Sequence, residues 1–391
     1  MNYLFKASAV IDRPKYVKKA VPASLSDVEP RGTIGRMERL PRLDGESLVD
    51  FFTGFMVYGL PGRGALGNAF AARFKAILED NGLNPKDDIP VERFLHLVQD
   101  DHIIGSRLQA WLSTIQLSWK TIQDGFHEKA DDYFAEMEGA DKAGPGTLEL
   151  NPDLIIPAYA KHEIHLQPGG YVGDPFSGYI NYYYANIFYA AFYKGNTQDQ
   201  VQADAVSRIP TPADGQVQRI LDMGCATGRL TLAVKERFPK SEVWGIDVGG
   251  PMVRFAHTRG IDLGIECHFA QRLAEDTKFP DNHFDLIISS IMHHEVSAAA
   301  TDDIVAEAFR VLRPGGVYFP MDHRTGKQLP KRDAATNFFV WLDHHVNNEV
   351  WRPEFESRDF AEVIRGAGFD VDENVRPARF GNGVILATKK A

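Results

Sequence analysis

The chain is poor in cysteine, carries fewer basic than acidic residues and has no long apolar run. Two cysteines among 391 residues are too few for a disulfide framework and favour a reducing compartment. The formal net charge of −10 argues against a nucleic-acid partner, because phosphate recognition needs a basic face. The most apolar early stretch, residues 48–60, is too short to cross a membrane and favours a buried helix.

The basic N-terminal segment, which contains Lys6, Arg13, Lys15, Lys18 and Lys19, lacks the apolar core of a signal peptide. We therefore expect a cytoplasmic protein with no membrane association. The hydrophobic fraction of 44% is enough for sizeable cores, and the length favours two domains.

The first half has a helical pattern. Residues 44–135 repeat apolar residues at helical spacing, with a helix end at Asn81–Gly82 and an interruption at Gly105. Residues 139–178 contain many Pro and Gly residues and predict a connector with turns. The tyrosine-rich residues 179–193 predict a helix. Its tyrosine rings either fill an apolar core with their hydroxyl groups in contact with water, or form a lid that faces a substrate. We expect residues 1–205 to form a mainly helical domain that covers a pocket of the second half and supplies a homodimer contact.

From about residue 216 the pattern alternates between strand and helix, which predicts a parallel sheet covered on both faces. Expected strands are residues 217–224, 242–249, 284–291 and 315–322. Residues 370–390 predict two further strands joined at Gly381–Gly383. The second domain, residues 206–391, is therefore expected to be α/β.

The stretch LDMGCATGRL, residues 221–230, is the most informative. An apolar strand ends at Asp222, a glycine-containing turn follows, and a helix begins near Arg229. Small residues let the backbone pass close to a ligand, and the helix start offers free N–H groups. A tight turn without a ligand would show the same glycines. However, Asp247 ends the next strand, where a carboxylate can accept hydrogen bonds from a ribose diol.

These motifs resemble those of class I S-adenosylmethionine-dependent methyltransferases. Asp222-x-Gly224-Cys225-x-Thr227-Gly228 is similar to the family's first motif, and Asp247 matches its ribose-binding acid. Residues 270–290 and 308–319 resemble the later motifs. The resemblance covers the C-terminal half only. It implies a Rossmann-like seven-stranded sheet with an antiparallel final hairpin, and S-adenosylmethionine as cofactor.

By position, the resemblance implies that the glycine loop lines the methionine and ribose, that Asp247 holds the ribose hydroxyls and that Leu273 and Ala274 border the adenine. Ala226 stands where many members have glycine, and Leu273 where an Asp or Asn that binds the adenine amino group is frequent. Glu275 or Asp276 could supply that hydrogen bond in place of Leu273. The expected cofactor-binding residues are Asp222, Gly224, Cys225, Gly228, Asp247, Val248, Leu273, Ala274 and Ser290.

The stretch SSIMHHEVS, residues 289–297, follows a predicted strand and so lies at the carboxyl edge of the sheet. His293 and His294 could be a catalytic base, a scaffold or metal ligands. His294-Glu295-Val296-Ser297 resembles the H-D-W-S sequence of plant-type O-methyltransferases, in which the histidine is the base. Imidazole titrates near neutrality and can take a hydroxyl proton. We expect His294, rather than His293, to face the acceptor.

Further histidines follow at His323 and at His344–His345, close to Glu349. They could supply mixed nitrogen and oxygen ligands, but no tight metal signature occurs. A polar acceptor pocket explains them more simply, so we expect no metal. The expected substrate-binding residues are Tyr182, Tyr183, His323 and His344.

The sequence thus predicts a methyltransferase that acts on a small-molecule acceptor, with O-methylation and a histidine base preferred. Transfer to sulfur or nitrogen without a base is an alternative, as is a regulatory subunit that binds the cofactor without catalysis.

Overall fold

The computed structural model describes residues 33–40, 42–192, 198–372 and 383–390. The basic N-terminal segment and most of the predicted join at Gly381–Gly383 lie outside these residues. Among the described residues, no helix combines the length and apolar character needed to cross a membrane.

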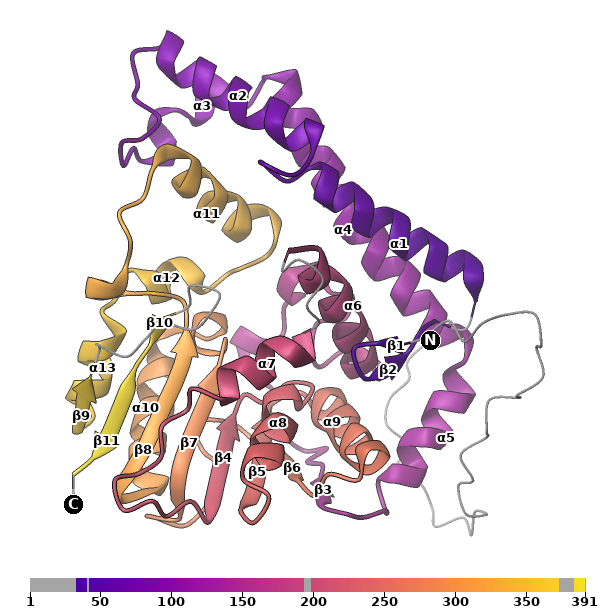
Figure 1. The fold of residues 1–391 in the computed structure, drawn as a ribbon, viewed down its shortest axis with the longest axis vertical. Helices are drawn as coiled ribbons and strands as arrows, with labels where there is room; N and C mark the ends of the chain where they lie inside the picture. The colour runs from indigo at the N-terminus through magenta and orange to yellow at the C-terminus, as the bar shows by residue number, and fades with distance from the viewer. Residues whose placement is uncertain (1–32, 41, 193–197, 373–382, 391) are drawn as a thin grey trace.

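Helices of the first half form an arch above the rest of the molecule (Figure 1). They are α1 (Leu43–Tyr58), α2 (Ala65–Asp80), α3 (Leu95–Val98), α4 (His102–Glu128) and α5 (Ala130–Ala140), with the short 3-10 helix η1 (Val91–Arg93) before α3. The predicted end at Asn81–Gly82 is confirmed, since Gly82 adopts a φ of +72°. The prediction that a helix is interrupted at Gly105 is wrong. The Asp101 side chain accepts hydrogen bonds from the first N–H groups of α4, and the helix continues through Gly105.

The tyrosine-rich segment is helix α6 (Ser177–Phe192), followed by α7 (Gln198–Val206). Tyr179, Tyr182, Tyr183 and Tyr184 are buried, and the ring of Tyr184 stacks on Trp119 of α4 with centroids 3.7 Å apart. Helix α6 therefore joins the arch to the second half, because its tyrosines also pack on Phe255 in the same aromatic core.

The central sheet has the order β3-β6-β5-β4-β7-β8-β11-β9, and β10 pairs with β8. Its strands are β3 (Thr147–Glu149), β4 (Arg219–Met223), β5 (Glu242–Asp247), β6 (His268–Gln271), β7 (Phe284–Ser290), β8 (Leu312–Asp322), β9 (Phe369–Asp372), β10 (Gly383–Val384) and β11 (Leu386–Lys389). A separate pair, β1 (Thr33–Ile34) and β2 (Met37–Glu38), lies beside α6 (Figure 1).

The predicted α/β class is confirmed, with parallel pairing from β3 to β8 and antiparallel pairing of β11 with both β8 and β9. Within the described residues the sheet has nine strands rather than the expected seven, because β3 and β10 extend it. The sequence analysis missed β3 because this three-residue edge strand is largely exposed and lies among turn residues.

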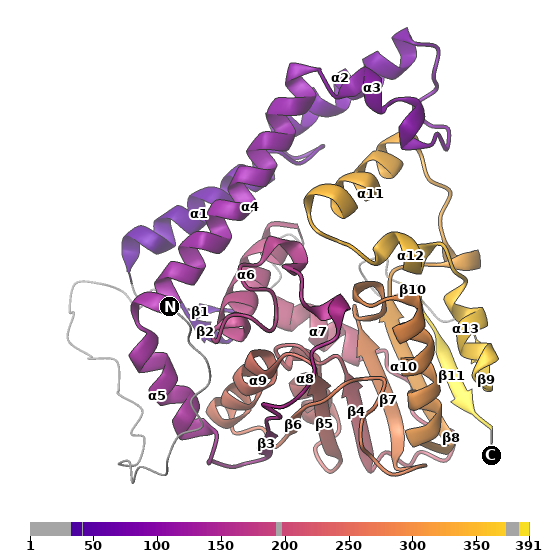
Figure 2. The same cartoon turned by 180° about the vertical axis from the view of Figure 1, so that it is seen from behind.

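Helices cover both faces of the sheet. Helix α10 (Ala298–Val311) and α13 (Phe360–Gly366) pack on one face, and α8 (Arg229–Arg237) and α9 (Gly250–Leu263) pack on the other. Figure 2 shows α10 beside β7 and β8. This two-sided cover explains why the strands are apolar on both faces.

Two elements cross between the halves. Strand β3 comes from the first half and pairs with β6. Helix α11 (Ala334–Val346) leaves the second half between β8 and β9 and packs under the arch, where Phe338 meets Phe70 and Phe74. The short helix α12 (Arg352–Glu356) follows. The domain division at residues 205 and 206 stays a prediction.

Candidate active site

A cavity of about 760 Å³ lies between the carboxyl ends of β4, β5, β7 and β8 and the helices α4, α6 and α11. The predicted glycine loop and the SSIMHHEVS stretch form its floor. Its apolar walls include Leu108, Trp111, Leu112, Ile115, Phe188 and Phe339. The cavity is therefore polar where it meets the sheet and largely apolar where it meets the arch.

The glycine loop has the backbone that its sequence predicts. Gly224 adopts a φ of +71°, and a Cβ there would lie 2.6 Å from the sulfur of Met292. Gly228 also has a positive φ and forms the N-terminal cap of α8, but it does not line the cavity. Asp222 is buried, which raises its pKa to about 7, and it accepts a 2.6 Å hydrogen bond from Thr231.

Asp247 fixes the same loop from the end of β5. Its Oδ2 accepts a hydrogen bond from the N–H of Ala226 at 2.9 Å, and its Oδ1 accepts one from Gly249 at 2.8 Å. Both oxygens keep lone pairs, because a carboxylate accepts about four hydrogen bonds. Of the predicted cofactor-binding residues, those that line the cavity are Asp222, Gly224, Cys225, Asp247, Val248, Ala274 and Ser290.

The predicted adenine border is only partly at the cavity. Leu273 does not line it and forms an isolated bridge with Asp276, whose carboxylate pairs with Lys278. Glu275 accepts a 2.6 Å hydrogen bond from Tyr159, which does line the cavity. The contact that substitutes for an adenine-binding Asp or Asn stays a prediction.

The two adjacent histidines point in different directions. His293 is fully buried, with its Nε2 2.7 Å from the Tyr318 hydroxyl and its ring beside Phe355 and Phe360. Burial lowers its pKa to about 4. His293 does not line the cavity, and this position corresponds to the scaffold alternative.

Replacing Tyr318 with phenylalanine tests this scaffold role. The change leaves the buried Nε2 of His293 without its partner, which costs about 1–3 kcal/mol of unfolding free energy. We expect urea denaturation to show this loss, with kcat almost unchanged. A large fall in kcat at full folding would instead place His293 in catalysis.

His294 lines the cavity and is held by Asp322 at the end of β8. Its Nδ1 lies 2.6 Å from Asp322 Oδ1, while Asp322 Oδ2 accepts hydrogen bonds from the backbone N–H groups of Met292 and His293. The ring Nε2 is therefore the atom left for other groups, with Glu295 Oε1 3.5 Å away and Glu349 Oε2 3.9 Å away.

The charges around His294 stabilise its protonated form. Burial alone would lower its pKa, but the charge and hydrogen bond of Asp322, together with Glu295 and Glu349, raise the pKa to about 10. The same contact with His294 holds the pKa of the buried Asp322 carboxyl below its usual range. Burial and the charge of Glu349 raise the pKa of Glu295 to about 7.

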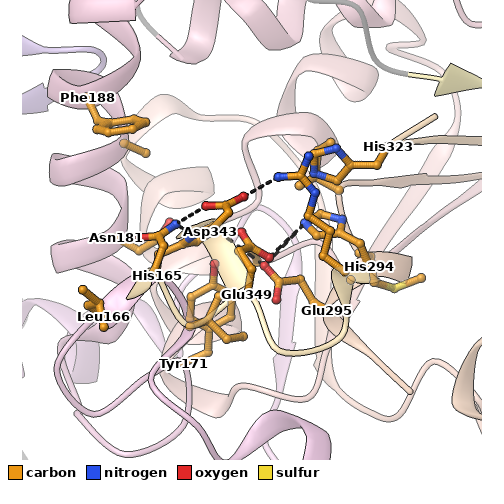
Figure 3. Close-up of a pocket in the computed structure, with 18 of the residues that line it drawn as sticks. His165, Leu166, Tyr171, Asn181, Phe188, His294, Glu295, His323, Asp343 and Glu349 are labelled. Atoms are coloured by element: carbon orange, nitrogen blue, oxygen red, sulfur yellow. Dashed lines mark hydrogen bonds and ion pairs between the residues drawn. The ribbon is translucent and has the colours of Figure 1, made fainter. Parts of the chain in front are cut away.

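His165 completes the polar floor, and the sequence analysis missed it. It lies in the 3-10 helix η3 (Ile164–Leu166) of the predicted connector, with its Nδ1 3.0 Å from Glu349 and its Nε2 3.5 Å from Glu295 (Figure 3). The ligand atoms of these three residues lie within 4.8 Å of one another and could hold a metal ion. The same contacts form a buried ion-pair network without one, and we interpret them as that network.

The predicted substrate-binding residues do not all lie at the cavity. His323 lines the cavity, and its ring lies edge-on to His294. His344 lies outside the lining, with its Nδ1 3.0 Å from the backbone oxygen of Glu349. Tyr182 binds Asp199, and the hydroxyl of Tyr183 accepts a hydrogen bond from the N–H of Leu40. Tyr184 lines the cavity in their place, because one-residue steps on a helix turn side chains by about 100°.

Comparison with known proteins points to one reaction class. Residues 220–316 match the family described as "Methyltransferase domain". The ubiquinone/menaquinone biosynthesis C-methyltransferase of Cupriavidus metallidurans is 29% identical over 191 residues, which cover 46% of this chain and 76% of the relative. An uncharacterized methyltransferase of Synechocystis is 31% identical over 155 residues, covering 39% and 68% respectively.

A fatty-acid O-methyltransferase of Mycolicibacterium smegmatis is 30% identical over 155 residues, covering 39% of this chain and 55% of the relative. Among solved structures, the chain is similar to phosphoethanolamine N-methyltransferase 2 of Haemonchus contortus in complex with S-adenosyl-L-methionine, at 16% identity and a TM-score of 0.36. That match covers 50% of this chain and about half, 53%, of the other.

Proposed function

The chain belongs to the class I S-adenosylmethionine-dependent methyltransferases, and from this premise we propose that it methylates a hydroxyl group of a small-molecule acceptor with His294 as the base. The Asp322–His294 pair at the cavity floor carries this proposal. It is the arrangement that holds an imidazole in one tautomer with the other nitrogen available.

S-adenosylmethionine supplies an electrophilic methyl group on a sulfonium when it is bound. The residues fit this cofactor, because Asp247 keeps lone pairs for the ribose hydroxyls and the loop at Gly224 has no side chain to obstruct a close approach. The cavity reaches from this loop to His294, so an acceptor in the remaining space would lie beside both. Holding the acceptor in line with the methyl group supplies much of the rate.

In the proposed step, Nε2 of His294 takes the proton of the acceptor hydroxyl. The hydroxyl oxygen would gain the methyl carbon as the bond from that carbon to sulfur breaks, with S-adenosylhomocysteine as the leaving group. Asp322 keeps the other ring nitrogen protonated, and Glu295 and Glu349 stabilise the imidazolium that results. The test is release of S-adenosylhomocysteine together with mass-spectrometric identification of an O-methylated product from a set of hydroxylated small molecules. Turnover that yields only S- or N-methyl products would contradict the proposal.

Carbon methylation is a second candidate, because one relative is named a C-methyltransferase. The same base could deprotonate a phenolic hydroxyl and make the adjacent ring carbon nucleophilic. NMR of the product separates the two outcomes, since methyl protons on oxygen and on carbon have different chemical shifts.

A homodimer and a cytoplasmic location also stay proposals. Size-exclusion chromatography with light scattering would test the first, and cell fractionation would test the second.

The pH dependence of kcat follows from the raised pKa of His294. The base must be unprotonated, and the groups that face it are Asp322, Glu295, Glu349 and the ring of His323. Because its pKa is raised to about 10, the unprotonated fraction grows about tenfold per pH unit below that value. We expect kcat to rise from pH 7.5 to 9.5, above the range in which Glu295 ionises.

The control for this profile is the Glu295→Gln variant, which removes a neighbouring carboxyl group that titrates near neutrality. The rise should remain but move to lower pH, because one of the charges that raise the pKa of His294 is lost. A profile that is flat in the wild-type enzyme between pH 7.5 and 9.5 would contradict His294 as the base. The buffer series needs constant ionic strength, because salt screens the surrounding charges.

A further inference from the structure

A buried arginine at the arch side of the cavity has no acidic partner in the part of the chain that the structure describes. Arg107 of α4 is 4% exposed and lines the cavity beside Leu60, Leu108 and Trp111. Its hydrogen bond runs from Nε to the backbone oxygen of Gly59 at 3.3 Å. Among the described residues, no carboxylate forms an ion pair with its guanidinium. Burial lowers its pKa to about 10, which still leaves it charged at neutral pH.

Two partly buried arginines elsewhere in the chain, Arg313 and Arg352, are paired with carboxylates. Arg313 contacts Asp285 and Asp214, and Arg352 contacts Asp343 and Glu356. A buried charge without a counter-charge is costly unless a ligand or another group compensates it. Arg107 therefore stands out from these pairs and needs a different explanation.

Aromatic rings hold the Arg107 guanidinium in place. Its central carbon lies 5.3 Å from the ring centre of Phe70, 4.9 Å from Trp111 and 5.3 Å from Phe339. These contacts offset part of the burial cost by cation–π attraction. They leave the terminal nitrogens without a hydrogen-bond acceptor among the described residues, and those nitrogens have the fork geometry that carboxylate and phosphate groups match.

We propose that Arg107 binds an anionic group of the methyl acceptor, so that the acceptor is an amphipathic acid. Its carboxylate, sulfonate or phosphate end would lie at Arg107, and its apolar body would lie along Trp111, Ile115 and Phe339. The nucleophile would lie at the opposite, polar end of the cavity near His294. The identification of this ligand as the methyl acceptor rests on the proposed function, but the anion site itself requires no catalysis.

The experiment compares two fluorescent probes that share one aromatic body. The first, 8-anilinonaphthalene-1-sulfonate, carries a sulfonate, and the second, N-phenyl-1-naphthylamine, has none. Each is titrated into the full chain as wild type, Arg107→Met and Arg107→Lys. Arg93→Met, which removes an exposed arginine of η1, is the matched control. Thermal melting and S-adenosylmethionine titration check that each variant is folded.

We expect Arg107→Met to weaken sulfonate binding by about tenfold to a hundredfold, the usual effect of losing a charged hydrogen bond, and to leave the neutral probe within about twofold. Arg107→Lys keeps the charge but loses the fork, so its loss should be intermediate. If the methionine variant does not fold, the lysine variant alone decides by the same comparison. Arg93→Met should change neither probe.

Equal weakening of both probes in Arg107→Met would show that Arg107 only shapes the cavity, and unchanged sulfonate affinity would show that the anion binds elsewhere. Either result overturns the proposal. Because the titrations need no turnover, an enzyme that lacks O-methylation but discriminates the probes through Arg107 would contradict the proposed function while supporting this site.

Discussion

Replacing His294 with alanine is expected to lower kcat by about 10²–10⁴-fold with a hydroxyl acceptor, the range that a positioned general base contributes. The reason is geometric. His294 is the ring at the cavity floor whose Nδ1 is occupied by Asp322, so that Nε2 is directed to the groups on the other side. S-adenosylmethionine affinity should stay within about threefold, because Asp247 and the glycine loop remain. Single-turnover kinetics and calorimetric titration measure the two quantities.

Asp322→Asn is the companion variant. Its amide can donate to His294 Nδ1, which favours the wrong tautomer and removes the charge that raises the histidine pKa. We expect a fall in kcat and a loss of the steep rise with pH. His345→Ala, which changes an exposed histidine of α11, is the matched control and should leave kcat unchanged. If His294→Ala retains kcat within about threefold, transfer requires no base at this position and the S- or N-methylation alternative gains.

Asp247→Asn is expected to weaken S-adenosylmethionine binding by about tenfold to a hundredfold, because hydrogen bonds to a charged group contribute about 1.5–3 kcal/mol. The carboxylate already accepts hydrogen bonds from the backbone N–H groups of Ala226 and Gly249. An amide has one acceptor oxygen in place of two, so it cannot keep both backbone bonds and also accept from a ribose diol. The loop and the cofactor contact are therefore lost together.

Calorimetric titration with S-adenosylmethionine and with S-adenosylhomocysteine measures this effect. Both share the ribose, so both affinities should fall by the same factor. Asp302→Asn, at an exposed carboxylate of α10 paired with Arg358, is the control and should leave both affinities within about twofold. Wild-type affinity in a folded Asp247→Asn variant would mean that the ribose hydroxyls are bound by other groups.

The sequence predicted the C-terminal fold closely because its information is local. Alternating strand and helix patterns located β4, β5, β7 and β8, and the positive φ of Gly224 follows from the turn that its neighbours require. The short exposed strand β3 has no such pattern, and its pairing with β6 depends on residues more than a hundred positions away. Its position is therefore a tertiary property.

The direction of a side chain was the least predictable feature. His293 and His294 are neighbours with the same chemistry, yet one packs on Phe360 in the core and the other binds Asp322 at the cavity. The sequence analysis favoured His294, but it had no basis for pairing it with Asp322. That pairing arises because β7 and β8 are adjacent and parallel, so that the carboxyl ends of the two strands meet at one edge of the sheet.

By itself the sequence determined the reaction class, the glycine loop and the edge of the sheet at which this loop and His294 lie, because consecutive residues carry these motifs. Only the tertiary structure decided which side chains enclose the cavity. His165 comes from the connector, Glu349 follows α11 and Arg107 lies on α4. No local pattern marks His165 or Arg107. The pattern that placed Glu349 near His344 and His345 did not predict its contact with His165, since these contacts depend on packing between distant segments.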